Sequence, residues 1–229
     1  TGPALDDAAN GLPEAREALA ALREGWALPT GRPFRNEDWS GAKRSALAAV
    51  RAQGYVTADW RFTDARIYPA ASRADLSGEV ASGPLHRTGE LRIEGLQFHD
   101  AETVRNLAAF GPGTPATEDL LLDFQERLRR SGLFDRGTVT LAPEPVDPAA
   151  TPVQVRLTER QLQEATVGVG ISANVGPRVS FEHTHRRFLG RALTTRNRVE
   201  WAKNEQLWDG EISTHTRERL WRNLVGAGV

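Results

Sequence analysis

The 229-residue chain contains no cysteine and no methionine. The absence of cysteine excludes disulfides, thiolate metal sites and a cysteine nucleophile, although it does not identify the cell compartment. The net charge is only −1, from 29 basic and 30 acidic residues, so no overall field recruits nucleic acid or anionic lipid. No apolar run approaches the roughly 20 residues that a transmembrane helix needs. The lack of such a run does not exclude a transmembrane β-barrel, because barrel strands carry a weaker, alternating signal.

One pattern occurs twice: an amphipathic helix, then glycine with an aromatic residue close behind, then an alternating strand. The first copy runs through residues 43–50 to Gly54-Tyr55, and the second through 119–130 to Gly132-Leu133-Phe134. The two glycines are 78 positions apart. This spacing is too long for a solenoid repeat and favours two tandem small domains.

The first copy predicts helices over residues 12–24 and 37–53, with Asn36 as the N-cap of the second and Gly54 as its left-handed C-terminal cap. Strands follow at about 55–68 and 75–83. The order is α-α-β-β, so we expect the opening strand of this copy to lie before residue 1. The start at Thr1 and the lack of methionine likewise indicate an internal fragment of a longer protein.

The second copy predicts a complete β-α-α-β-β unit, with strands at 89–98, about 134–143 and about 152–159, and helices at 101–110 and from Thr117. Gly132 is the expected left-handed cap of its second helix. The apolar face of each element predicts a core made of Leu91, Ile93, Val104, Leu107, Leu121, Phe124, Leu128, Val139, Val153 and Val155.

After Glu164 no helical period survives, and segments of about ten residues alternate between apolar and polar side chains. Such segments are typical of outer-membrane barrel strands, and a soluble β-meander has the same period. A barrel predicts that one set of side chains faces lipid: Val167, Val169, Ile171, Val179, Phe181, Val199 and Trp201. The other face, toward the lumen, would carry Glu182, Glu200, Asp209 and Glu211.

The motif Leu120-x3-Phe124-x3-Leu128-x3-Gly132 followed by Leu133-Phe134 resembles a POTRA domain. In the first copy, Gly31-x-Pro33-Phe34-x4-Trp39-x3-Lys43 resembles the preceding POTRA domain of TamA-type proteins. These are outer-membrane subunits of the translocation and assembly module and relatives of the barrel-assembly protein BamA. The segment Gly168-x-Gly170-x-Ser172 is similar to the first barrel strand of that family.

The resemblance implies an α+β fold of tandem POTRA domains followed by antiparallel strands of a truncated transmembrane β-barrel. The implied domains are 1–87 (N-terminally truncated), 88–161, and the first barrel strands at 162–229. It also implies an outer-membrane location, with residues 1–161 in the periplasm. The implied partners are unfolded outer-membrane or autotransporter polypeptides, an inner-membrane-anchored protein that spans the periplasm, and outer-membrane lipid, but no nucleic acid.

Catalytic, cofactor and metal motifs are weak, and we predict a protein that is not an enzyme and needs no cofactor. Gly168-x-Gly170 is not a dinucleotide fingerprint, because no helix follows it. His183 and His185 share a strand face, but a metal site would need a third ligand such as His215. Polar residues facing a lumen explain this pair better.

An exposed edge strand can bind an extended polypeptide through main-chain hydrogen bonds. The best candidate is the strand after Phe134, at Arg136, Gly137, Thr138, Val139 and Thr140. The alternative is an edge that is merely solvated or packed on a neighbouring unit. The resemblance implies a second pairing site, a lateral seam at the first barrel strand, formed by Val167, Gly168, Val169, Gly170 and Ile171. Its glycines fit a strand of weakly specified register, or a simple barrel bend.

Three functions follow from these features. The first is an assembly or translocation factor whose periplasmic arm captures unfolded substrates and whose barrel assists their insertion or secretion. The second is a two-partner secretion transporter, which also joins two POTRA domains to a barrel but exports one dedicated substrate. The third is a soluble periplasmic binding module with a β-rich third domain.

Overall fold

The computed structural model describes residues 11–142, 147–172, 176–203, 205–217 and 220–229. Contacts divide the chain into two compact units. The first comprises Thr1–Glu90, Gly111–Leu122 and Leu141–Val153, and the second comprises Leu91–Phe110, Asp123–Thr140 and Gln154–Val229. The division into domains at 1–87, 88–161 and 162–229 stays a prediction.

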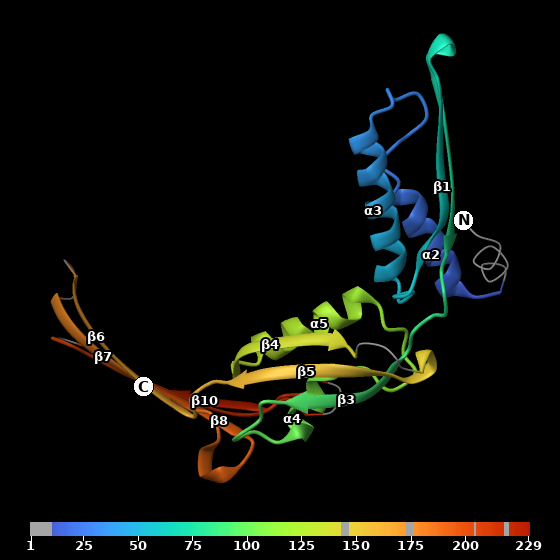
Figure 1. The fold of residues 1–229 in the computed structure, drawn as a ribbon. Coiled ribbons are helices and arrows are strands. Elements are labelled where there is room, and N and C mark those ends of the chain that lie inside the picture. The colour runs from blue at the N-terminus through green and yellow to red at the C-terminus, as the bar shows by residue number, and fades with distance from the viewer. Residues whose placement is uncertain (1–10, 143–146, 173–175, 204, 218–219) are drawn as a thin grey trace. The chain divides into compact units, whose positions relative to one another are not determined.

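The first copy contains two helices and one β-ribbon (Figure 1). The helices are α2 (Pro13–Glu24) and α3 (Asn36–Ala52); the strands β1 (Asp59–Tyr68) and β2 (Arg73–Ala81) are joined by a short 3-10 turn, η1 (Pro69–Ala71). The two strands pair antiparallel as a two-stranded sheet. The N-cap of α3 is Arg35 rather than Asn36, because Arg35 is still extended while its carbonyl already accepts the N–H of Trp39.

Small side chains let α2 and α3 pack closely against the ribbon. Ala18, Ala46 and Val50 have no exposed surface, and Val80 from β2 packs in the same cluster. A second cluster forms around Trp39, whose ring meets that of Trp26 edge to face with centroids 5.6 Å apart. Along α3, Trp39, Ala46 and Val50 are therefore buried, and Leu47 is half-buried.

The second copy has the predicted β-α-α-β-β order. Its elements are β3 (Thr88–Glu94), α4 (Ala101–Ala108), α5 (Glu118–Arg130), β4 (Phe134–Leu141), η2 (Pro148–Ala150) and β5 (Thr151–Glu159). The strands form one sheet in the order β3-β5-β4, which leaves β3 and β4 at the two edges.

The predicted core of this copy is confirmed in its main members. Phe124 and Leu128 are fully buried, and the ring of Phe110 meets that of Phe124 edge to face at 5.5 Å. Five further members are buried: Val104, Leu107, Val139, Val153 and Val155. The remaining three, Leu91, Ile93 and Leu121, are half-buried.

Both predicted glycine caps have a left-handed backbone. Gly54 follows α3 with φ +92°, and Gly132 follows α5 with φ +73°. Residues with a Cβ rarely adopt this conformation, so the two positions favour glycine for the same reason.

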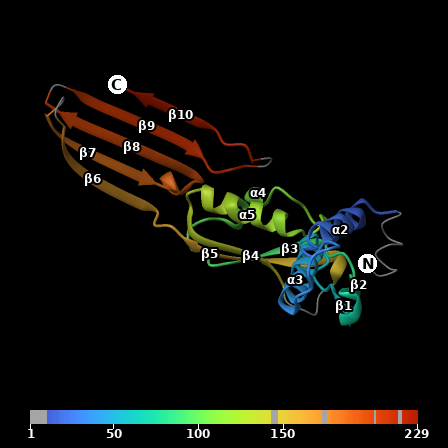
Figure 2. The same ribbon diagram turned by 90° about the horizontal axis from the view of Figure 1, so that it is seen from above.

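The C-terminal part is one antiparallel sheet of five strands in the order β10-β9-β8-β7-β6 (Figure 2). The strands are β6 (Gln163–Ser172), β7 (Gly176–His185), β8 (Leu193–Ala202), β9 (Gln206–Thr214) and β10 (Leu224–Gly228), and a short turn η3 (Phe188–Gly190) precedes β8. The predicted change from helical to alternating structure after Glu164 is confirmed. Within the described ranges, no helix is both long enough and apolar enough to cross a membrane.

Candidate functional site

The two edges of the β3-β5-β4 sheet are covered to different extents. At the beginning of β3, the N–H of Thr88 donates to the carbonyl of Thr114 (2.8 Å), and its carbonyl accepts the N–H of Gly113 (2.7 Å). The Thr88 hydroxyl also donates to Gly111 O (2.8 Å). The loop before α5 thus occupies the beginning of the β3 edge.

The five residues predicted to bind a strand all lie on β4, at the other edge. Arg136, Thr138 and Thr140 are exposed, whereas Val139 is buried and Gly137 is half-buried. A side chain at Gly137 would meet Leu157 Cδ2 at 3.2 Å, so Gly137 lies over the core. Because side chains alternate along a strand, one face of β4 packs inward while the other stays in solvent.

A side chain that the sequence analysis did not identify contacts this edge. Gln125 Oε1 of α5 accepts a hydrogen bond from the backbone N–H of Val139, with the two atoms 3.2 Å apart. The two residues are 14 positions apart in different elements, so no local sequence pattern reveals the contact.

The predicted seam residues lie on β6, which is an edge strand of the five-stranded sheet. Val167, Val169 and Ile171 are 68, 82 and 87% exposed. A Cβ added to Gly168 would meet Ser180 Oγ on β7 at 2.5 Å. Gly168 therefore makes room for its cross-strand neighbour, which is a more direct reason for a glycine here than weak register.

The pairing register sorts the predicted side chains onto two faces. Val167 pairs with Phe181, Val169 with Val179, and these continue to Val199, Trp201 and Trp208. The opposite face carries Glu182, Glu200, Asp209 and Glu211. On that face Arg178 and Arg198 both pair with Glu200, at 3.3 and 3.2 Å, and Arg196 lies 3.6 Å from Glu182. The sheet therefore has one apolar face and one charged face, as the alternation predicts.

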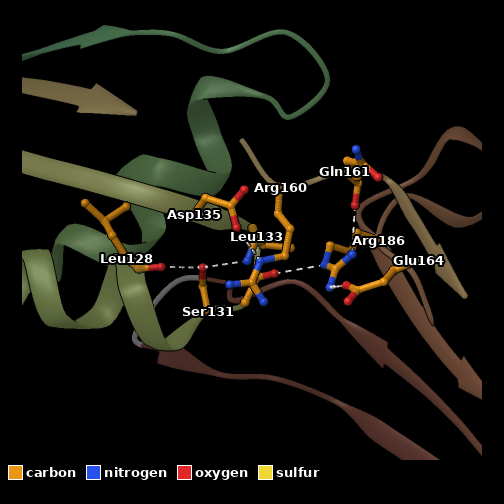
Figure 3. A network of polar contacts seen from close by, with 9 residues as sticks. Leu128, Ser131, Leu133, Asp135, Arg160, Gln161, Glu164 and Arg186 are labelled. Atoms are coloured by element: carbon orange, nitrogen blue, oxygen red, sulfur yellow. Dashed lines mark hydrogen bonds and ion pairs between the residues drawn. The ribbon is translucent and has the colours of Figure 1, made fainter. Parts of the chain in front are cut away.

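Arg186 connects the second copy to the five-stranded sheet (Figure 3). Its buried guanidinium donates to the carbonyls of Gly132 (3.0 Å) and Gln161 (2.8 Å) and to the carboxylate of Glu164 (2.7 Å). The backbone N–H of Arg186 also donates to Leu162 O (2.7 Å). One side chain after β7 thus binds the end of α5, the link before β6, and β6 itself. Because the planar guanidinium makes three hydrogen bonds at once, it favours one geometry at this junction.

Two buried imidazoles lie beside the same junction. His99, before α4, packs edge to face on Phe134 and on His215, with centroids 5.9 and 5.3 Å apart. His215 Nε2 bonds to the carbonyl of Arg186 (2.8 Å). Burial lowers the pKa of His99, and burial lowers the pKa of His215 to about 4 against the opposing effect of the Arg186 carbonyl. Both rings are therefore neutral near pH 7.

The loop that carries His99 is held by a carboxylate. Glu159, at the end of β5, accepts the backbone N–H groups of Gln97, Phe98 and His99 at 3.0, 2.7 and 2.8 Å. Asp100 occupies the N-cap position of α4, but its side chain makes no capping bond and instead faces Arg187 at 3.5 Å. The start of α4 is thus positioned by β5 rather than by its own cap.

The arginines at the end of α5 have specific structural partners. Arg127 donates to the carbonyls of Leu107 and Ala108 at the end of α4, at 2.7 and 2.6 Å. Arg129 and Arg130 both pair with Glu126 at 2.6 Å. Those hydrogen bonds, with Arg129 first, lower the pKa of Glu126 to about 2. The cluster is thereby explained without an anionic ligand.

The histidines considered as metal ligands do not come together with a third ligand. The expectation that His183 and His185 share the charged face is wrong, because both lie on the β7 face of Val179 and Phe181. Their ring centroids are 6.5 Å apart, whereas His215 packs on His99. Among the residues that the structure describes, no group of three or more histidines, aspartates or glutamates is arranged to hold a metal ion.

Comparison with known proteins identifies the fold. No family model and no curated protein matches the chain. The crystal structure of BamA from Haemophilus ducreyi lacking POTRA domains 1–3 superposes with a TM-score of 0.67 and 15% identity, over 88% of this chain and 37% of that one. CdiB from Acinetobacter baumannii superposes with a TM-score of 0.50 and 11% identity, over 90% of this chain and 40% of that one.

The predicted fold class is confirmed: an α+β part followed by an antiparallel sheet, as in that BamA structure. The chain spans about two fifths of the length of these two solved structures. At such low identity, the similarity describes the fold only.

Proposed function

We propose that the chain is the arm and the first barrel strands of an outer-membrane assembly or translocation factor of the TamA and BamA kind. The observation that carries this proposal is the exposed apolar face of the β6–β10 sheet, in the same chain as two modules with well-buried cores. The similarity in fold to BamA supports it.

The apolar face fits a lipid environment. Val169 and Ile171 are more than four-fifths exposed, and Trp201, Trp208 and Val225 add large apolar surface on the same face. Exposed apolar patches of this extent mark interaction surfaces in soluble proteins and lipid contacts in barrels. The opposite face carries paired charges, which a water-filled lumen tolerates.

In this function, strand pairing captures the substrate. The β4 edge, at residues 136–140, adds an extended segment of an unfolded outer-membrane or autotransporter polypeptide through main-chain hydrogen bonds. The edge of β6, at residues 167–171, forms the lateral seam where substrate strands pair. Both sites would bind the substrate through its main-chain hydrogen-bonding groups rather than its side chains, which suits substrates of many different sequences.

The remaining parts of the proposal concern place and partners. Residues 1–161 face the periplasm as POTRA domains at 1–87 and 88–161, and residues 162–229 begin the barrel in the outer membrane. An inner-membrane-anchored protein that spans the periplasm is the proposed partner of a TamA-type subunit. No catalytic step is proposed.

Two other functions remain as rivals. A two-partner secretion transporter shares this architecture and differs in having one dedicated substrate. A soluble periplasmic binding module would use the same arm without lipid.

The cysteine-free sequence allows a direct test of the lipid-facing surface. Single cysteines at Val167 and Val169, and at Thr166 and Ser180 on the charged face, are labelled with a polarity-sensitive fluorophore in the full-length protein folded into vesicles. We expect blue-shifted emission only at the two valine positions. Equal emission at all four positions would favour the soluble module.

A further inference from the structure

The backbone of β4 points its groups alternately toward β5 and toward the open edge of the sheet. Just past the end of β4, the N–H of Ala142 donates to Pro152 O on β5 at 2.8 Å. Val139 lies three positions earlier, so its N–H points the other way, to the open edge. A strand that adds to β4 therefore needs the N–H of Val139 as one of its donors.

That donor is already occupied by a side chain. Gln125 Oε1 accepts the N–H of Val139 at 3.2 Å, from a half-buried position on α5. The preceding residue, Phe124, is fully buried and anchors this turn of the helix. The amide of Gln125 is thus presented to the edge by a rigid element.

The two edges of the sheet are therefore closed by different means. The beginning of β3 is covered by backbone from residues 111–115, through two main-chain hydrogen bonds of Thr88. Removing that cover would require a loop to move. At β4 the contact is one side-chain amide, which rotation about side-chain torsions can withdraw.

We propose that Gln125 is a removable cap on the β4 edge, which an incoming strand displaces by supplying its own carbonyl to Val139. This inference rests on the proposed strand capture at β4 and adds its regulation. The cap satisfies a donor that would otherwise be exposed on an edge, and it sets a threshold that a weakly pairing segment does not overcome.

The size of the threshold follows from the hydrogen bond that is exchanged. A typical intramolecular hydrogen bond has a small net contribution, because water replaces the lost partner. Removing the cap with Gln125→Ala should therefore tighten strand binding about threefold to tenfold. Gln125→Glu offers a charged acceptor, which bonds an N–H more strongly, and should weaken strand binding.

The probe is a fluorescent synthetic peptide with the sequence of residues 163–172, an alternating barrel strand from this chain. Its binding to the full-length protein in detergent micelles is followed by fluorescence anisotropy. A second peptide carries Val167→Pro and Gly168→Pro, which removes a donor from each of its edges. Gln97→Ala is the matched protein control, since Gln97 is exposed and lies outside β4 and α5.

The outcomes distinguish the proposed capping of Val139 by Gln125 from the proposed strand binding at β4. Tighter binding to Gln125→Ala than to wild type, with no change for Gln97→Ala, supports the cap. Equal binding to wild type and Gln125→Ala overturns the cap and leaves capture intact. No binding to either protein overturns the capture, and binding of the proline peptide at equal strength shows that the contact is not strand addition.

Hydrogen exchange tests the cap without any peptide. In the free protein, the amide of Val139 should exchange several-fold faster in Gln125→Ala than in wild type, while the amides of β5 should be unchanged. An unchanged rate at Val139 would overturn the cap whatever the peptide does.

Discussion

Apolar strand side chains are buried in the second copy but exposed on one face of the C-terminal sheet. In the second copy, Val153 and Val155 of β5 are fully buried, whereas Val169 and Ile171 of β6 are 82 and 87% exposed. Both regions contain alternating strands with the same types of side chain. The difference is that α4 and α5 cover one sheet, while the described residues after β5 contain no α-helix that could cover the other. The comparison teaches that alternation locates an apolar face but does not say what covers it.

The two copies within the arm show how far a repeat can change while keeping its frame. Ala46 and Val50 occupy the positions of Phe124 and Leu128, and all four are fully buried. In the first copy, the partly buried rings of Trp26 and Trp60 pack against the cluster that holds the smaller Ala46 and Val50. The glycine that follows the helix is left-handed in both copies.

The largest expected effect is on stability, from a substitution in the buried core of the second copy. Phe124→Ala should lower the free energy of unfolding by about 3–5 kcal/mol, because it removes a fully buried ring and leaves a cavity. Urea unfolding measures this. Leu122→Ala on the same helix is the control, since Leu122 is 52% exposed and should change stability by about 0.5 kcal/mol or less. Equal effects would mean that α5 does not cover a core.

A charged side chain introduced on the exposed apolar face of the C-terminal sheet tests whether that face contacts lipid. Val167→Arg should destabilise the full-length protein in vesicles by about 2–4 kcal/mol if its position is near the middle of the bilayer. Thr166→Arg, on the neighbouring residue, should have little effect because Thr166 pairs with Glu182 on the charged face. Folding titrations into vesicles of defined composition measure both. Equal tolerance at the two positions would favour a soluble β-domain.

The junction between the two regions should weaken in mild acid. Unfolded histidines take up protons near pH 6.5, whereas buried His99 and His215 resist protonation, so the unfolded state binds more protons. The free energy of unfolding should therefore fall by about 1–3 kcal/mol as pH drops from about 6.5 to about 4. His215→Gln should flatten this slope. A slope that persists unchanged in His215→Gln would assign it to other groups.

The smallest effect concerns the backbone that both copies share. Gly132→Val should destabilise the protein by about 1–2 kcal/mol, because φ is +73° there and a β-branched residue is strained in that region. Gly111→Val is the control: a Cβ at Gly111 meets nothing within 4 Å and its φ is not left-handed. Thermal unfolding compares the two. An unchanged midpoint for Gly132→Val would mean that the turn adapts to a side chain.

Much of the fold was predictable because its signals are local. The period of α5, the glycine after it and the alternation after Glu164 each act over a few residues, and each prediction is confirmed. The two faces of the C-terminal sheet also follow from alternation alone. The N-cap of α3 lies one residue before the predicted Asn36, because Arg35 is still extended and the helix already begins at Asn36.

The candidate site likewise has features that local sequence predicts and features that depend on long-range contacts. That residues 136–140 form a strand follows from their sequence, but their place at an edge depends on the order β3-β5-β4, which distant pairing decides. The contacts of Arg186, the packing of His99 on His215, and the bond from Val139 to Gln125 join residues between 14 and 116 positions apart. Sequence by itself determined the elements and their apolar faces, because those depend on neighbouring residues. Only the tertiary structure decided which edges are open and which polar groups meet, because burial and hydrogen bonding are properties of the assembled chain.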